Sequence, residues 1–335
     1  MLVKQAHAVP PRCSAGAAPL RVAGSARRTS SIDISWPDGR AGNMVLVGRA
    51  RDIVTPRSGG PALTCREDGL RASLRPDRTI TAIEASPSRQ ALSGLVGERG
   101  GGGLRQALER VVPEEKRDAT PLYLILDDIS GASLVAGWAW SLWDPNWLAN
   151  GLAAMKGFDV AKAFRDRTGI CSGFVAGSSA FDPSADRSGT PAPDLRHPED
   201  PDGWHAFTVQ DGAVGMRRAR RIDVWLDDVI VIDSAFQDSA STPSGGRAVV
   251  HEYRLTVTAD PSSLRVLAAQ AEPRVLPFVE CTSAPANLAR LIGTPLPDLR
   301  DRVLAELRGT AGCTHLNDAL RALAEVPALV ERLPS

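Results

Sequence analysis

The chain has 335 residues, enough for two ordinary domains with well-buried cores, because domains usually contain about 100 to 200 residues. Its 39 basic and 39 acidic residues give a formal net charge of +0, and aromatic residues make up only 5% of the chain. No basic footprint of the kind that nucleic-acid-binding or membrane-surface proteins carry is visible, so we expect neither kind of partner.

The N-terminal region and the cysteines indicate where the protein works. Five cysteines are few and odd in number for this length, which argues against a secreted disulfide framework and favours a reducing compartment. Pro10 and Pro11 interrupt the first 20 residues before any sustained apolar run, so the sequence indicates neither a signal peptide nor a membrane span. We therefore expect a cytoplasmic protein. Residues 1–23 are rich in Ala, Pro, Ser and Gly and are predicted to be a disordered tail.

Residues 24–182 are predicted to form a β-rich N-terminal domain with a few short helices. The segment RRTSSIDISW (27–36) alternates apolar and polar residues, which is typical of a half-buried strand. The stretch PLYLILDDISGASLVAGWAW (121–140) is interpreted as two strands joined across Asp127, Asp128 and Gly131, because adjacent Asp residues between apolar runs usually form a turn. Alternatively, these two carboxylates hold Mg²⁺ or act as acid and base. Helical spacing is present at 104–112, 146–155 and 159–167.

Residues 183–203 contain almost no large apolar side chains and are predicted to be a linker or long loop before a second domain, 204–335. Three strands are expected there, followed by helices that end near Gly293, near Gly309 and before Pro327. The predicted fold class is therefore α+β, with a β-rich N-terminal part and then a small antiparallel sheet with a C-terminal helical bundle. Asp227 and Asp228 lie between two of the strands and are interpreted as a hairpin turn.

The motif GCTHLNDALRAL (312–323) carries the clearest chemical signal. Its apolar residues recur at helical spacing, which predicts a helix that begins near Thr314. Cys313 on the preceding loop can approach His315, and Cys281 stands at the start of an earlier predicted helix. The positive end of a helix dipole favours the thiolate form, so Cys281, Cys313 and His315 could together bind zinc, iron or an iron–sulfur cluster. Alternatively, the two cysteines are small buried apolar residues, or one is a thiol nucleophile.

Three further features have two interpretations each. His251 lies on the apolar face of a predicted strand, where it is either a core histidine or a ligand or general base. The run RRARR (217–221) is either an anion clamp or a solvated strand edge. Four tryptophans between Trp138 and Trp147 line a substrate pocket or pack in a core.

Several segments, among them LILDDISGASLVA, RRARRIDVWL, HEYRLTV and GTAGCTHLNDALRAL, resemble in order a bacterial family catalogued as domain of unknown function 2889. The resemblance covers nearly the whole chain after the tail and implies no known activity. Residues 276–324 also resemble the C-terminal part of iron–sulfur cluster scaffold proteins, which implies Cys281 and Cys313 as ligands with His315 beside them.

The leading hypothesis from the sequence is a cytoplasmic metal-dependent enzyme that acts on a small organic substrate. In it Cys281, Cys313 and His315 hold zinc or iron, and His251 is the catalytic base or a further ligand. One alternative is a non-catalytic metal or iron–sulfur scaffold or accessory protein whose partner is an acceptor protein. Another is a binding module whose cysteines are structural.

Overall fold

The computed structural model describes residues 9–144, 146–147, 166–182, 189–208 and 212–334. The strands within these ranges are β1 Ser25–Ser35, β2 Met44–Thr55, β3 Leu63–Leu74, β4 Ile80–Ser86, β5 Thr190–Pro191, β6 Gly215–Leu226, β7 Ile230–Ser241, β8 Arg247–Ala259 and β9 Val266–Val275. The α-helices are α1 Leu104–Val111, α2 Pro113–Arg117, α3 Pro121–Val135, α4 Trp138–Trp143, α7 Leu299–Glu306, α8 Thr314–Ala322 and α9 Val326–Val330. The 3₁₀ helices are η1 Gln90–Leu95, η2 Ser172–Phe174, η3 Ser179–Phe181, η4 Pro201–Gly203, η5 Val279–Leu291, η6 Leu296–Asp298, η7 Gly309–Ala311 and η8 Leu323–Glu325.

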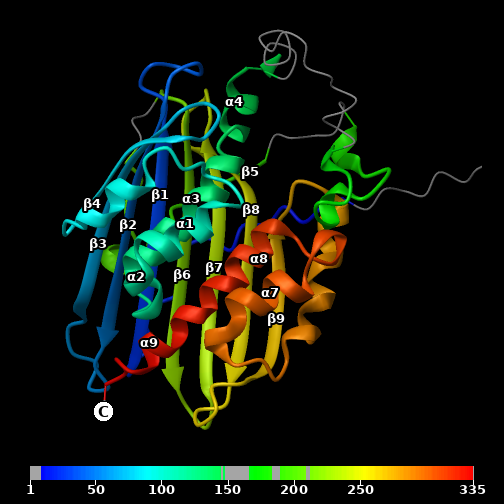
Figure 1. The fold of residues 1–335 in the computed structure, drawn as a ribbon. Coiled ribbons are helices and arrows are strands. Elements are labelled where there is room, and N and C mark those ends of the chain that lie inside the picture. Colours follow the sequence, from blue (N-terminus) through cyan, green and yellow to red (C-terminus); the bar gives the residue numbers. More distant parts are fainter. Residues whose placement is uncertain (1–8, 145, 148–165, 183–188, 209–211, 335) are drawn as a thin grey trace, which may run out of the picture.

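The strands form one antiparallel sheet in the order β4-β3-β2-β1-β6-β7-β8-β5, and β9 also pairs with β8. Figure 1 shows α1, α3, α7 and α8 together on one face of this sheet. The expected mixture of helices and antiparallel strands is confirmed, but the predicted N-terminal strands and the predicted small second sheet are parts of a single sheet. The C-terminal helices pack directly on its strands, with Leu320 and Val303 in one core with Ile232 and Leu255.

Strands β1 and β6 join the two parts of the sheet at its centre. They pair along their whole length, from Ser25 opposite Trp225 to Ser35 opposite Gly215. Both strands are buried on both faces, including the arginines of the RRARR run. The interpretation of this run as a solvated strand edge is therefore wrong, because neighbouring carboxylates pair with these guanidinium groups inside the protein.

The two parts of the molecule are internal repeats of each other. Each is a four-stranded antiparallel meander followed by a 3₁₀ helix and α-helices. The sequences RRTSSIDI (27–34) and RRARRIDV (217–224) stand at matching positions in β1 and β6 and are identical at four of eight places. Their register is also symmetric, since Arg28 lies opposite Ile222 and Ile32 lies opposite Arg218. The central ladder thus relates the halves as an approximate two-fold axis would.

The same repeat is visible where each meander meets its 3₁₀ helix. In the first half the amide of Gly97 donates to the carbonyl of Ile80, and the amide of Ile80 donates to the carbonyl of Glu98. In the second half Gly293, Val266 and Thr294 form the same pair of bonds. Both glycines have positive φ, 92° and 80°, a conformation that favours glycine.

Helix α3 replaces the hairpin that the sequence predicts at 121–140. Pro121 occupies its first turn, and the Thr120 side chain caps it by accepting a hydrogen bond from the Tyr123 amide. Nearly every side of the helix is buried, and a continuous apolar run does not distinguish a buried helix from a strand. Asp127 and Asp128 consequently lie inside a helix rather than in a turn, whereas Asp227 and Asp228 do occupy the turn between β6 and β7. Among the described helices, the stretch Pro121–Trp143 is long and apolar enough to cross a membrane. However, 72% of its most apolar 18-residue part is buried inside the protein.

The face of the sheet opposite the helices is covered by two segments that were predicted to lack structure. The described part of the predicted tail is bonded to the sheet: Leu276 donates its amide to Pro11, and Cys13 donates its amide to Arg274. The described part of the predicted linker lies on the same face, where Leu195 packs against the buried Ala18 and accepts a hydrogen bond from its amide. Composition does not reveal these bonds, because the backbone makes them. Residues 1–8 and 183–188, and most of the predicted helices at 146–155 and 159–167, lie outside the described residues.

Candidate metal centre between the sheet and helix α8

Three side chains from three elements converge on the helix-covered face. Asp238 in β7 lies opposite His251 in β8 across the ladder, and α8 brings His315 onto them from its first turn. One ligand atom from each residue lies within 4.8 Å of the others. Among the described residues, these three side chains therefore form a group that could hold a metal ion. His251 is buried on the apolar side of its strand, as the alternation of β8 predicts.

The two imidazoles are arranged around one carboxylate oxygen. Asp238 Oδ2 lies 3.6 Å from His251 Nδ1 and 3.8 Å from His315 Nε2. The two rings are stacked with their centroids 3.4 Å apart and an angle of 17° between their planes. His251 Nδ1 is buried and has no hydrogen-bond partner. A nitrogen in this state can accept a metal ion, although parallel rings must tilt before both nitrogens point at one ion.

The protonation states suit metal binding. Burial lowers the pKa of His251 and outweighs the opposing influence of Asp238. Burial, followed by the neighbouring His251, lowers the pKa of His315 well below its ordinary value. Burial alone would raise the pKa of Asp238, but the guanidinium of Arg218 holds it below its ordinary value. The group therefore consists of two neutral imidazoles and one ionised carboxylate near neutral pH.

Arg218 fixes the carboxylate in place. Its Nε donates to Asp238 Oδ1 at 2.9 Å and its Nη2 donates to Asp238 Oδ2 at 3.0 Å. The remaining Nη1 donates to Asp318 on α8 at 3.0 Å and lies 3.5 Å from Asp128 on α3. This fork connects the sheet to both helices, so the position of Asp238 depends on the packing of the whole layer.

The cysteines predicted as ligands are distributed differently. Cys313 is the N-cap residue of α8, and its Sγ lies 4.0 Å from His315 Nδ1. Cys281 does not belong to the three-residue group; its thiol lies beside Gly173, near Cys171. Burial raises the pKa of Cys281, Cys313 and Cys171, which opposes the thiolate form expected for a ligand. Cys281 also lies inside η5 rather than ahead of an α-helix, so no macrodipole offsets its burial.

Sequence reasoning missed Asp238 and its pairing with Arg218, which was considered as part of an anion clamp. The signal for Asp238 is its position: β7 directs Ile232 and Phe236 to the helix-covered face, and Asp238 follows at the same spacing of two. A carboxylate on an apolar face needs a buried partner, which the sequence offers in the RRARR run. The distance in sequence between the two residues hides the pairing.

The four tryptophans do not form one wall. Trp138 packs edge-on against His251, with ring centroids 6.3 Å apart. Trp140 instead packs on Trp36, and Trp143 donates its indole N–H to the carbonyl of Ser241 at 2.9 Å. Only Trp138 among these three borders the metal-binding group.

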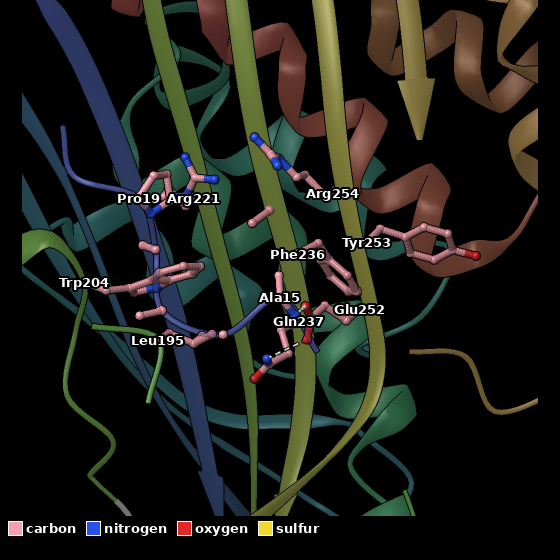
Figure 2. Close-up of a pocket in the computed structure, with 14 residues that line it drawn as sticks. Ala15, Pro19, Leu195, Trp204, Arg221, Phe236, Gln237, Glu252, Tyr253 and Arg254 are labelled. Atoms are coloured by element: carbon pink, nitrogen blue, oxygen red, sulfur yellow. Dashed lines mark hydrogen bonds between the residues drawn. The ribbon is translucent and has the colours of Figure 1, made fainter. Parts of the chain in front are cut away.

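The opposite face of the sheet carries a pocket of about 220 Å³ beneath the N-terminal segment. Figure 2 shows Glu252 and Gln237 at its centre, next to Ala15, while the ring of Tyr253 points away from them. Glu252 accepts hydrogen bonds from the Ser14 hydroxyl at 2.7 Å, the Ala15 amide at 2.5 Å and the Gln237 amide group at 2.9 Å. Its carboxylate thus anchors the N-terminal segment and is not free for a ligand.

The model of a family described as "Protein of unknown function (DUF2889)" matches residues 216–329. This range contains Arg218, Asp238, His251 and His315, and it also contains both predicted cysteine ligands. The first half lies outside the match, so the family resemblance extends over less of the chain than the sequence segments indicate. Neither any curated protein nor any solved structure matches the chain, and the resemblance to iron–sulfur scaffold proteins is unsupported.

Proposed function

We propose that the protein is a metal-dependent enzyme that acts on a small organic substrate, with zinc or iron held by Asp238, His251 and His315. The observation that carries the proposal is the convergence of two neutral imidazoles and one ionised carboxylate within 4.8 Å. Of the residues predicted from the sequence, this set keeps His251 and His315 and replaces the cysteines by Asp238.

The donor set matches the preferences of these metals. Two imidazole nitrogens and a carboxylate oxygen are typical of catalytic zinc sites and of non-haem iron sites, which keep a coordination position open. A bound metal would supply Lewis-acid chemistry to a substrate at that position. The side chain of His315 is 16% exposed, so the group is partly accessible to solvent.

The surrounding residues have supporting roles in this proposal. Arg218 orients Asp238 and keeps it ionised, as carboxylates next to metal ions require. Cys313 lies beside the second nitrogen of His315 and can hold the orientation of that ring. Trp138 covers one side of His251 and limits the access of water.

Titration calorimetry of the metal-free full chain with zinc alone tests the proposal. We expect binding of about one ion per chain, lost in His315→Ala and in Asp238→Asn and retained in His197→Ala, whose imidazole lies outside the group. Unfolding curves in urea separate loss of binding from loss of fold. Absence of zinc and ferrous iron binding to a folded wild-type protein would refute the proposal.

A non-catalytic iron–sulfur scaffold remains the second candidate because of one observation. The thiols of Cys171, Cys281 and Cys313 lie close enough to influence one another's pKa. Anaerobic purification distinguishes the two proposals: iron with an equal amount of acid-labile sulfide, lost in Cys281→Ser but kept in His251→Ala, favours the scaffold. Metal lost in His251→Ala but kept in Cys281→Ser favours the enzyme. Absence of any metal leaves a binding module with structural cysteines.

A further inference from the structure

A second cavity lies on the sheet face opposite the metal-binding group. Its volume is about 510 Å³, and it is enclosed by segment 192–196, segment 205–207, β6 and the start of β8. Pockets that bind small molecules usually have volumes of about 300 to 1,000 Å³, so this cavity is large enough for a small organic ligand. Arg217 points to this face, because its neighbour Arg218 points to the helices.

Two arginines in this cavity have donors without partners. Arg217 is only 2% exposed, and its Nη2 donates to the carbonyl of His205 at 2.5 Å. Its Nε has no hydrogen-bond partner and lies 3.5 Å from Asp33. Arg247 donates to the Ser239 hydroxyl, and its Nε likewise has no partner. Buried guanidinium donors are costly when unpaired, so these groups favour an anion.

The charges around the cavity also favour an anion. Arg196, Arg217 and Arg247 line the cavity. Among the described residues, the carboxylates of Asp33 and Asp194 oppose their charge, and these two also pair with Arg49 and Arg196. Burial, and then the charge of Arg217, lowers the pKa of Arg247 to about 10.

An aromatic ring and a neutral imidazole complete the lining. The guanidinium of Arg247 lies 4.5 Å from the ring centre of Phe207, and that of Arg217 lies 5.8 Å from it. Burial, followed by nearby arginines, lowers the pKa of His205 to about 2, so its imidazole is neutral. Both of its nitrogens are buried and lack hydrogen-bond partners.

We propose that this cavity binds a small organic oxyanion. Arg217 and Arg247 hold its carboxylate or phosphate group, and Phe207 contacts its apolar body. A guanidinium fork matches both groups in geometry, because each presents two oxygens to parallel N–H donors. The site is independent of the metal-binding group, since the sheet separates them.

Titration calorimetry with inorganic phosphate and with benzoate tests the site and distinguishes the two kinds of anion. We expect saturable binding of at least one of them, and no comparable binding of benzyl alcohol, which has the ring but no charge. Arg247→Gln should weaken this binding at least tenfold. The matched control is Arg254→Gln, because Arg254 lies on the same face of the sheet but pairs with Asp233 outside the cavity. It should bind as the wild type does.

Arg217→Lys provides a second variant that keeps the buried charge and removes the fork. We expect it to remain folded in urea titrations and to bind the anion at least tenfold more weakly. The proposal is overturned if folded wild-type protein binds neither phosphate nor benzoate saturably. It is equally overturned if Arg247→Gln and Arg217→Lys both bind as tightly as Arg254→Gln.

Discussion

Equivalent carboxylates in the two halves of the molecule have different surroundings. Asp52 in the first half pairs with Arg28 at 2.6 Å, as Asp238 in the second half pairs with Arg218 at 2.9 Å. Asp52 also lies 3.3 Å from the guanidinium of Arg332. Guanidinium groups therefore surround Asp52.

Asp238, in contrast, pairs with one guanidinium group and also lies beside two imidazoles, those of His251 and His315. The arginine–aspartate pair is common to both halves and belongs to the scaffold. The imidazoles are confined to the second half, since no histidine lies between residues 8 and 196. The comparison teaches that the candidate metal ligands belong to one copy of a repeated arginine–aspartate arrangement, whereas the carboxylate of the other copy has guanidinium neighbours.

The largest expected effect comes from exchanging the two carboxylates for amides. Asp52→Asn leaves Arg28 and Arg332 without a shared anion, and we expect it to lower the free energy of unfolding by about 3–5 kcal/mol. Asp238→Asn should destabilise the protein to a similar degree and also abolish zinc binding. Urea unfolding and zinc titration of both variants check this. Loss of zinc binding in a folded Asp52→Asn protein would contradict the division of roles.

Lowering the pH should destabilise the protein through histidines of the second half. His205, His251 and His315 have folded pKa values below the ordinary value of about 6.5. Below that pH the unfolded chain binds protons that the folded protein does not. The free energy of unfolding therefore decreases as the pH is lowered, by about 1.4 kcal/mol per pH unit for each such histidine. Urea unfolding at pH 8, 6 and 5 should show this fall beginning near pH 6.5. A smaller slope is expected for His315→Leu, and an unchanged slope would contradict the assignment.

Zinc should stabilise the folded protein through the second half alone. At a free concentration one hundred times the dissociation constant, binding adds about 2.7 kcal/mol to the free energy of unfolding. We expect this increment in the wild type and its loss in His315→Ala. The first-half variant Thr120→Ala serves as the comparison and should show the full increment, because it lies outside the metal-binding group.

The smallest effects concern the N-caps of α3 and α8, one helix from each half. The Thr120 hydroxyl accepts from the Tyr123 amide at 3.1 Å, and Thr120→Ala should cost about 1 kcal/mol. Cys313 makes no side-chain cap bond, so Cys313→Ser exchanges a buried thiol for a hydroxyl that can cap α8. We expect a smaller change than for Thr120→Ala. Thermal unfolding of both variants measures the difference, and a larger loss in Cys313→Ser would show that the thiol does more than fill space.

Local patterns in the sequence predict much of the secondary structure. The spacing of Leu316, Ala319, Leu320 and Leu323 predicts the buried face of α8, and the structure confirms it. The alternation in β8 likewise places His251 on the inner face. Both predictions depend on residues within a few positions of one another, where side-chain direction follows directly from backbone period.

The features that the sequence does not reveal depend on distant partners. Helix α3 is buried on nearly all sides by elements from both halves, so its sequence lacks a polar face that would mark it as a helix. The metal-binding group needs Asp238 and His315, which are 77 residues apart and meet only after the sheet and α8 pack. The pairing of β1 with β6 joins residues that are still farther apart in the sequence. It places strands from the two predicted domains in one sheet.

The central ladder also sets a schedule for folding during synthesis. Ser30 in β1 lies opposite Arg220 in β6, 190 positions later in the chain. At about 5–20 residues per second, a ribosome needs roughly 10–40 s to deliver the second strand after the first. For that interval β1 is an unpaired strand edge, and its Arg27, Arg28 and Asp33 are charges of the kind that discourage pairing with a wrong chain. The residues that hold the finished sheet together are thus also suited to keeping the growing chain from aggregating.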